Sequence, residues 1–242
     1  SGIKEIVLVG INLSAYGKNE DFDIVDAVNV CAENKMIERI RLGSLEPDHI
    51  TDDIVERLAK IEKFCPQFHL SLQSGCNKTL KNMNRHYTAE EYKALCHKLR
   101  STFDNASITT DVMVGFHQEE EKDFEESLSF VKEIAFEKVH TFPYSEREGT
   151  AASKKGDSVP KKEKERRAAV MIAETDKIRT EYLKGLIGQN TEVLFENEIS
   201  ENVYQGYTKN YLPVQITSKE NLVGKTICVK IRDCNADYCI AE

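Results

Sequence analysis

CPQFHLSLQSGCNKTLKNMNR, residues 65–85, contains the strand and the turn that decide the fold. Apolar residues alternate with polar ones over residues 67–73, which is the pattern of a strand with one buried face. The strand ends at Gln73-Ser74-Gly75, where a glycine and two polar side chains follow the last apolar residue. The stretch therefore predicts a core strand whose carboxyl end carries polar groups.

Two cysteines and a histidine in this stretch raise the question of a metal site. His69 lies within the expected strand and Cys76 lies in the loop beyond it, so the two side chains are not expected to converge. The seven cysteines of the chain have irregular spacings and form no CxxC pair, which is typical of reduced thiols in the cytoplasm. We therefore predict no metal ligands and a cytoplasmic location.

The alternation of strand and helix extends outward from this stretch. Apolar spacing predicts strands over residues 4–12, 37–44, 67–73, 106–116 and 138–145. It predicts helices between them, over residues 23–36, 51–64, 88–103 and 119–136. Strands that alternate with helices pair in parallel through right-handed crossovers. The expected fold class is therefore α/β, as an open sheet or a partial (β/α) barrel.

The pattern changes after residue 150. A polar linker leads to Pro160, which suits the first turn of a helix over residues 161–184. The basic run at the start of this helix, KKEKERR, is typical of a solvated face or of a phosphate contact. Short strands follow, over residues 191–197, 203–210, 211–218, 225–233 and 237–242. They predict a small all-β barrel of OB-like type. The expected domains are residues 1–150, 151–187 and 188–242.

Composition excludes several classes of protein. The net charge of −8 argues against a general binder of nucleic acids, although it leaves room for a local basic face. The longest apolar runs have the length of a strand, so we expect no membrane partner. The chain opens on Ser1-Gly2-Ile3 without a signal peptide or an initiator methionine, so we expect that it begins after a cut.

Polar residues and glycines follow every strand of the predicted sheet. The carboxyl ends of parallel strands share one edge, and such edges bind ligands in α/β proteins. A polar small molecule would suit this edge, whereas the residues contain neither a phosphate loop nor a Ser-His-Asp set. A purely structural reading remains open, because any α/β protein has polar strand ends. The candidates are Asn12, Ser44, Glu46, Gln73, Ser74, Arg85, Asp111, Gly115 and Tyr144.

Five stretches, taken in order, resemble the radical S-adenosylmethionine domain of methylthiotransferases, and most closely the branch that acts on threonylcarbamoyladenosine in tRNA. They read KEIVLVGINLSAYG, RIRLGSLEP, FHLSLQSGCNKTLKNMNRHYT, ITTDVMVGF and FPYSEREGTAA. The strand-rich tail, with VYQGYTKNYLPVQI, is similar to the TRAM domain that ends these enzymes. One stretch departs from the family pattern, since Gly-Phe-His-Gln-Glu stands at residues 115–119 where the family usually has Gly-Phe-Pro-Gly-Glu.

The resemblance implies an enzyme that installs a methylthio group on the adenine ring of tRNA. It implies S-adenosylmethionine, two [4Fe-4S] clusters and a reductant for them. The six cysteine ligands of those clusters would precede Ser1, so we expect a C-terminal fragment that is inactive alone. The open alternatives are a non-catalytic RNA-binding remnant and a related enzyme that acts on another tRNA base or on a ribosomal protein.

The resemblance and the chemistry of the side chains suggest roles for the candidates. Gln73 and Ser74 would face S-adenosylmethionine or the target base, and Arg85 would hold a carboxylate or phosphate unless it forms a plain salt bridge. Asp111 would accept from ribose hydroxyls, and an adenine ring would rest beside Tyr144. In the tail, aromatic and basic residues on adjacent strands suit stacking on unpaired bases. They are Tyr204, Tyr207, Lys209 and Tyr211.

Overall fold

The strand and helix elements of the first 150 residues alternate as the sequence predicts. A computed structural model of the protein describes residues 2–150 and 152–242. Ser1 and Ala151 lie outside the described residues, and Ala151 is the first residue of the predicted linker. The strands are β1 (Glu5–Leu8), β2 (Arg39–Leu42), β3 (Ser44–Leu45), β4 (Gln67–Leu70), β5 (Ser107–Val114) and β6 (Lys138–Pro143). The helices are α1 (Ile24–Ala32), α2 (Asp52–Leu58), α3 (Asn77–Asn82), α4 (Ala89–Thr102) and α5 (Glu121–Ile134).

All pairs among these strands are parallel, which confirms the α/β prediction. β1 pairs with β2, and a second sheet has the order β3-β4-β5-β6. The predicted strand over residues 37–44 is divided at Gly43, whose N–H donates to the Leu8 carbonyl at 2.8 Å. Beyond this glycine the chain leaves β1 and pairs with β4 instead. An isolated parallel bridge between Ile40 of β2 and Phe64 links β2 to the segment that precedes β4.

Helix α3 is an element that the sequence did not predict. It has six residues, which is too few for an apolar periodicity to show. Helix α4 begins with a capping box, in which Thr88 accepts from the Glu91 N–H while the Glu91 carboxylate accepts from the Thr88 N–H. The short α3 matters for the site, because the turn after it leads to Arg85.

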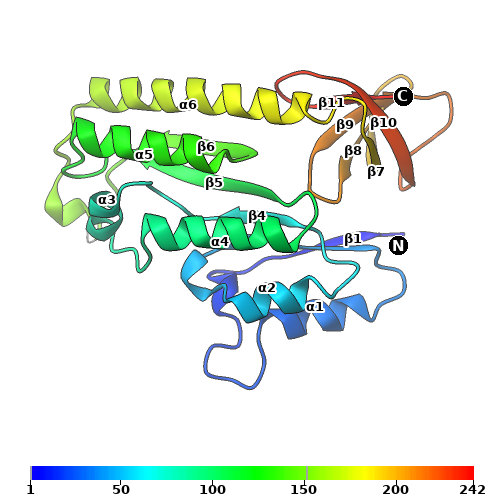
Figure 1. The fold of residues 1–242 in the computed structure, drawn as a ribbon, viewed down its shortest axis with the longest axis horizontal. Coiled ribbons are helices and arrows are strands. Elements are labelled where there is room, and N and C mark those ends of the chain that lie inside the picture. The colour runs from blue at the N-terminus through cyan, green and yellow to red at the C-terminus, as the bar shows by residue number, and fades with distance from the viewer. Residues whose placement is uncertain (1, 151) are drawn as a thin grey trace.

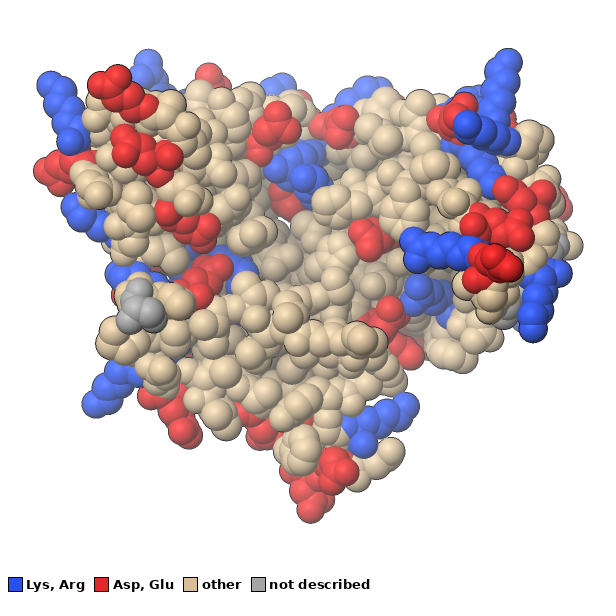
Figure 2. All heavy atoms as spheres, turned by 180° about the vertical axis from the view of Figure 1, so that it is seen from behind, with Lys and Arg blue, Asp and Glu red and all other residues tan. Residues whose placement is uncertain are grey.

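The helices leave one face of the larger sheet open. Figure 1 shows α4 and α5 in front of β4, β5 and β6, with α1 and α2 beside β1. Along β5, the side chains of alternate residues are buried against these helices, whereas those of Thr109, Asp111 and Met113 are partly exposed on the other side. Seen from behind, the molecule is hollowed near its centre, and most residues around the hollow are uncharged (Figure 2). The sheet thus has one side covered by helices and one accessible side.

Helix α6 (Lys161–Lys184) connects this sheet to a closed barrel of five strands. The helix has the bounds that the sequence predicts, and it packs along β6 (Figure 1). The barrel strands are β7 (Asn190–Ser200), β8 (Val203–Thr208), β9 (Pro213–Thr217), β10 (Thr226–Cys234) and β11 (Cys239–Ala241), closed in the order β10-β11-β9-β8-β7. The barrel has its own apolar core, which includes Phe195, Val214 and Ile231. The predicted closed barrel is therefore confirmed.

Two buried arginines of β2 connect the sheet to the barrel. The side chains of Arg39 and Arg41 are 1% and 2% exposed. Arg39 donates to the Tyr207 carbonyl at 2.7 Å. Arg41 donates to the Thr208 and Lys209 carbonyls at 2.8 and 2.6 Å. Because each guanidinium is enclosed by both parts of the chain, the barrel is held in one position against β2.

Candidate active site

A pocket of about 450 Å³ lies at the carboxyl ends of β5 and β6. Residues after β4, at and after the end of α3, and after β6 complete its wall, so one edge of the sheet gathers side chains from four separate stretches. A volume of this order is typical of small-molecule sites. The lining residues are Gln73, Asn82, Met83, Asn84, Arg85, Met113, Phe116, Phe142, Pro143, Tyr144, Ser145, Arg147, Thr150 and Ala152.

Gln73 lies in the pocket because of an unusual backbone conformation. Its φ is +66°, in the left-handed region that side chains other than glycine rarely adopt. The conformation is held by two hydrogen bonds to β5, from the Gln73 N–H to the Asp111 carbonyl and from the Met113 N–H to the Gln73 carbonyl, each 2.9 Å long. Strain of this kind is concentrated at functional sites.

Arg85 and Glu46 form an ion pair at the pocket, with 2.7 Å between Nη1 and Oε2. The two side chains are 27% and 33% exposed, so the pair is accessible from the pocket. Glu46 is itself positioned by its backbone N–H, which donates to Ser14 Oγ at 3.0 Å. Both readings of Arg85 are compatible with this geometry, because a guanidinium has five N–H donors and one carboxylate oxygen occupies only part of them.

Tyr144 forms an aromatic corner of the pocket with Phe116. The two rings meet edge to face, with centroids 5.0 Å apart and an angle of 72° between planes. The Tyr144 hydroxyl is buried and has no hydrogen-bond partner among the described residues. From the other side, Lys164 of α6 donates to the Tyr144 carbonyl at 3.0 Å, lies 5.0 Å from the ring centroid and pairs with Asp157. These contacts with Lys164 hold Tyr144 in place.

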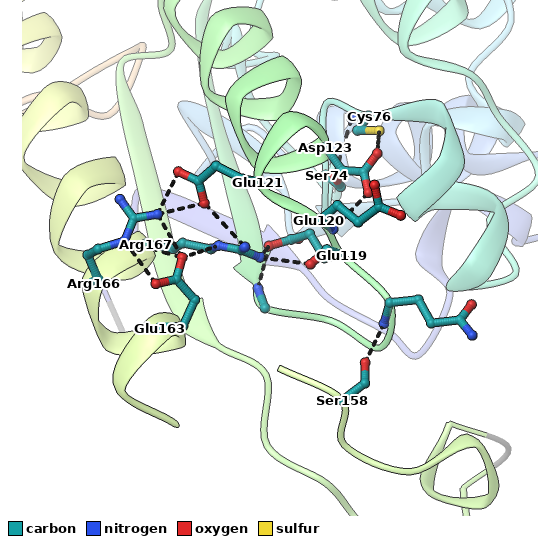
Figure 3. Close-up of polar contacts among 12 residues, drawn as sticks. Ser74, Cys76, Glu119, Glu120, Glu121, Asp123, Ser158, Glu163, Arg166 and Arg167 are labelled. Carbon is teal, nitrogen blue, oxygen red and sulfur yellow. Dashed lines mark hydrogen bonds and ion pairs between the residues drawn. The ribbon is translucent and has the colours of Figure 1, made fainter. Parts of the chain in front are cut away.

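A buried ionic network at the start of α6 supports the turn after β5 (Figure 3). Glu119 Oε1 accepts from the Gly115 N–H at 2.7 Å and from Arg167 Nη1 at 2.8 Å. The Glu119 and Arg167 side chains are 2% and 5% exposed. Burial raises the pKa of Glu119, against the opposing effects of the Gly115 N–H and Arg167. The prediction of a solvated basic face is therefore wrong for Lys164 and Arg167, which are buried.

Gly115 is required by this packing. Its φ is +72°, and a Cβ added to it would lie 2.4 Å from Cγ of Lys164. The turn that departs from the family pattern thus closes on α6, and Gln118 donates its N–H to Ser158 Oγ at 2.7 Å (Figure 3). A loop without the expected proline is held by these contacts instead.

The structure brings together only part of the predicted site. Gln73, Arg85 and Tyr144 line the pocket, and Glu46 joins them through its pair with Arg85. Five other candidates lie outside the lining, and they are Asn12, Ser44, Ser74, Asp111 and Gly115.

Two of these five are exposed and do not line the pocket, and one is a structural residue. Asn12 is exposed and precedes a short 3-10 helix (Leu13–Ala15), and Ser44 is exposed on β3. Ser74 is fully buried, and its Oγ accepts from the Cys76 N–H at 3.2 Å. Its neighbour Gly75 packs on Phe130, which a Cβ would approach to 2.5 Å. The Gln-Ser-Gly turn thus presents its first residue to the pocket and packs the other two.

Asp111 belongs to a polar group on the open face of the sheet. Its Oδ2 lies 3.4 Å from Nε2 of His69, and this hydrogen bond holds the pKa of Asp111 below its usual value. Nδ1 of His69 lies 3.0 Å from Thr109 Oγ1, and the His140 ring lies 6.0 Å from the His69 ring between centroids. Burial lowers the pKa of His140. The two histidines therefore lie side by side on the open face of the sheet.

Apolar lining residues are the part of the pocket that the sequence did not single out. Met113 and Phe142 pair in register on β5 and β6 and face the same side. The period-two pattern of these strands could have identified them, because alternate residues of β5 point away from the helices. An apolar wall next to Gln73 and Arg85 suits a ligand with both a flat ring and polar ends.

The four candidate residues of the tail lie in two different environments. Tyr204 is buried in the barrel core, so it presents no ring face to a base. Tyr207 and Tyr211 stack with centroids 4.6 Å apart and an interplanar angle of 14°. Nζ of Lys209 donates to the Glu62 carbonyl at 3.2 Å. The latter three residues therefore lie where the barrel faces the sheet.

Within the parts of the chain that the structure describes, no three histidine, cysteine, aspartate or glutamate side chains converge as metal ligands would. The donor set present here does not fit an iron–sulfur cluster, and we assign no residue to one. None of the described helices is both long and apolar enough to cross a membrane.

Comparison with known proteins identifies the family of this chain. The family described as the Radical SAM superfamily matches residues 1–131. The chain is 38% identical, over 97% of its length, to a tRNA-2-methylthio-N(6)-dimethylallyladenosine synthase of Clostridium botulinum, of which it covers 53%. It is 35% identical, over 98% of its length, to the threonylcarbamoyladenosine tRNA methylthiotransferase of Bacillus subtilis, of which it covers 54%.

Among solved structures, coproporphyrinogen III oxidase of Escherichia coli aligns with a TM-score of 0.49 at 18% identity, covering 68% of this chain and 39% of that one. The chain spans about half the length of the curated relatives above. The family match extends over more than half of the chain and includes β1 to β5 and most of α5. On this evidence the chain belongs to the radical SAM superfamily, and its relatives include tRNA methylthiotransferases.

Proposed function

We propose that the chain is part of a tRNA methylthiotransferase that binds S-adenosylmethionine in the pocket at the strand ends. The observation that carries the proposal is the meeting of Gln73, Arg85 and Tyr144 in that pocket, in a chain 35–38% identical to methylthiotransferases. The group implied by the superfamily is a cluster-bound S-adenosylmethionine, which supplies a carbon radical when it is cleaved by one electron.

The pocket fits the parts of S-adenosylmethionine one by one. The Phe116–Tyr144 corner and the side chains of Met113 and Phe142 offer an apolar slot for an adenine ring. The partnerless Tyr144 hydroxyl is a polar group for which a ligand would be a natural partner. Gln73 and Arg85 suit the amino acid end, because an amide and a guanidinium bind carboxylates. The protein's part is to orient the ligand and exclude water.

For the target base we favour threonylcarbamoyladenosine. This base carries a carboxylate, and a second arginine in the pocket lining, Arg147, would be left to bind it while Arg85 holds the amino acid end of S-adenosylmethionine. Dimethylallyladenosine, the base named for the relative at 38% identity, is the second candidate. Its apolar substituent would suit Met113 and Phe142 instead. The two bases would therefore contact different walls of the same pocket.

In this proposal the tail barrel is a TRAM domain of OB-like type that contacts tRNA through Tyr207, Lys209 and Tyr211. The domains would be residues 1–150, 151–187 and 188–242. Two [4Fe-4S] clusters with ligands from outside this chain and a reductant would complete the enzyme, which would act in the cytoplasm. The chain alone would be inactive. A stoichiometric cluster on this chain after supply of iron and sulfide would contradict that.

Replacing Arg85 by alanine tests the pocket. We expect the affinity of the chain for S-adenosylmethionine, measured by titration calorimetry, to fall at least tenfold, because a charge-assisted hydrogen bond contributes about 1.5–3 kcal/mol. Arg57→Ala is the matched control, since Arg57 is also partly exposed and paired with a carboxylate, that of Asp23. Equal losses in both variants, or none in either, would place the ligand elsewhere.

A further inference from the structure

A second pocket, of about 500 Å³, lies between the open face of the sheet and the tail barrel. It shares no lining residue with the pocket at the strand ends. Thr109 lines this pocket and Met113 lines the other, so along β5 the two are separated by about 13 Å at the usual rise of a strand. The sheet contributes Gln67, His69, Thr109, Lys138 and His140, and the barrel contributes Gln205, Tyr207 and Tyr211 among others.

One wall of this pocket is a fixed aromatic stack. Tyr211 stacks on Tyr207 at 4.6 Å, and the Arg41 guanidinium lies 4.7 Å from the Tyr211 ring centroid. Arg41 is itself held by Glu5, with 2.6 Å between Nε and Oε1. Tyr211 has φ +66°, a strained conformation for a bulky residue, and its side chain remains 45% exposed. A rigid, accessible ring surface of this kind costs little entropy when a flat ligand stacks on it.

The sheet wall of the pocket carries imidazoles and the barrel wall adds an amide, and both kinds of group can donate and accept hydrogen bonds. The rings of His69 and His140 lie on the sheet with 6.0 Å between centroids. Gln205 lies at the barrel side, and its Oε1 accepts from Gln215 Nε2 at 3.0 Å. Groups of this type match the edge of a nucleobase better than they match a phosphate or an aliphatic chain.

The charges around the pocket balance. Lys138 and Arg179 face Glu137 and Asp237 among its lining residues. Arg179 and Glu137 are buried and paired with one another, so neither is a free site for an ionic ligand. Without an excess of positive charge, the pocket is not a phosphate site. The ligand it suits is therefore flat, uncharged and rich in hydrogen-bonding groups.

We propose that this pocket binds the base of an unpaired nucleotide, stacked on the Tyr207–Tyr211 pair and contacted by His140. The inference deepens the proposed function and rests on it, since the nucleotide would belong to the tRNA whose target base enters the strand-end pocket. A free nucleoside carries the same base, so the test compares binding of free nucleosides with binding of RNA.

The test uses the chain as it is and follows its tyrosine fluorescence, because the chain has nine tyrosines and no tryptophan. The probes are adenosine, cytidine and a single-stranded RNA pentamer. We expect saturable binding of the pentamer, weakened about tenfold by Tyr207→Leu, as for the loss of a stacking platform. Tyr207→Phe keeps the ring and should bind as the unchanged chain does, and His140→Ala should weaken binding as well.

Tyr16→Leu is the matched control, because Tyr16 is 48% exposed and packs only on Phe22 among aromatic residues described. Binding of the nucleosides as well as the pentamer would assign the ring alone as the ligand, and binding of the pentamer only would assign RNA. Absence of binding to every probe, or equal binding by Tyr207→Leu and Tyr16→Leu, would overturn the inference.

Titration of the unchanged chain with S-adenosylmethionine is run in parallel. It reports on the strand-end pocket, so it separates the two proposals. RNA binding that depends on Tyr207, without binding of S-adenosylmethionine, would leave the second pocket standing and remove the assignment of the strand-end pocket to S-adenosylmethionine. The reverse result would remove only the second pocket.

Discussion

Replacement of Arg41 by methionine is expected to destabilise the protein by about 3–5 kcal/mol, because it leaves the Glu5 carboxylate without its closest partner. The Glu5 side chain is only 10% exposed, so water cannot replace the lost guanidinium fully. The variant also loses the hydrogen bonds to the Thr208 and Lys209 carbonyls and the cation over the Tyr211 ring. The barrel would then no longer be tied to β2.

The measurement is thermal unfolding followed by circular dichroism, and we expect Tm to fall by roughly 10 °C for a chain of this size. A second, separate transition would show that the barrel now unfolds independently of the sheet. Arg232→Met serves as the control, since Arg232 is an exposed residue of β10. If Arg41→Met and Arg232→Met both have the same Tm as the unchanged chain, the contact between the sheet and the barrel contributes nothing to stability.

Replacement of Arg167 by methionine is the second large effect that we expect. It removes the partner of the Glu119 carboxylate, whose side chain is 2% exposed, and such losses cost about 3–5 kcal/mol. The turn at Gly115 depends on the same carboxylate, so the wall of the pocket beside Phe116 and Tyr144 should loosen too. Affinity for S-adenosylmethionine is expected to fall together with stability.

The pH dependence of this variant identifies the cause. Burial already raises the pKa of Glu119, and loss of Arg167 raises it further. For a carboxyl whose pKa is higher in the folded state, the stabilising contribution is present below the unfolded-state pKa and is lost as the pH rises through the folded-state value. Arg167→Met should therefore be more destabilising at pH 8 than at pH 5 in urea unfolding.

Glu119→Gln combined with Arg167→Met is the matched control for that experiment. Glutamine keeps an acceptor for the Gly115 N–H and carries no charge, so the double variant should recover part of the stability and lose the pH dependence. If the destabilisation caused by Arg167→Met alone does not change with pH, lost packing and not the unpaired carboxylate is responsible for it.

The order of elements could be predicted from sequence because each has a strong local signal. Helix α6 follows a proline, α4 has a capping box, and the strands of the sheet have period-two patterns. Helix α3 has no such signal, and the division at Gly43 depends on which strand the chain pairs with next. Pairing of that kind is a tertiary property, which local patterns do not report.

The site was predicted in part for a similar reason. Residues at strand ends could be identified, but the direction in which each points depends on the backbone of its turn. Gln73 faces the pocket through a positive φ, whereas Ser74 is turned inward. The basic run of α6 showed the limit of charge patterns, because Lys164 and Arg167 are buried against acidic partners that lie elsewhere in the chain. Local sequence cannot reveal such partners.

The central claim is that this chain serves a tRNA methylthiotransferase. Its most direct test is anaerobic reconstitution of the full-length protein that contains the chain, with iron, sulfide, S-adenosylmethionine and a reductant, followed by mass analysis of nucleosides from tRNA. We expect threonylcarbamoyladenosine to gain a methylthio group, and we expect Arg85→Ala to remove most of this gain. A protein that loads its clusters and cleaves S-adenosylmethionine, yet leaves every tRNA nucleoside unchanged, would contradict it.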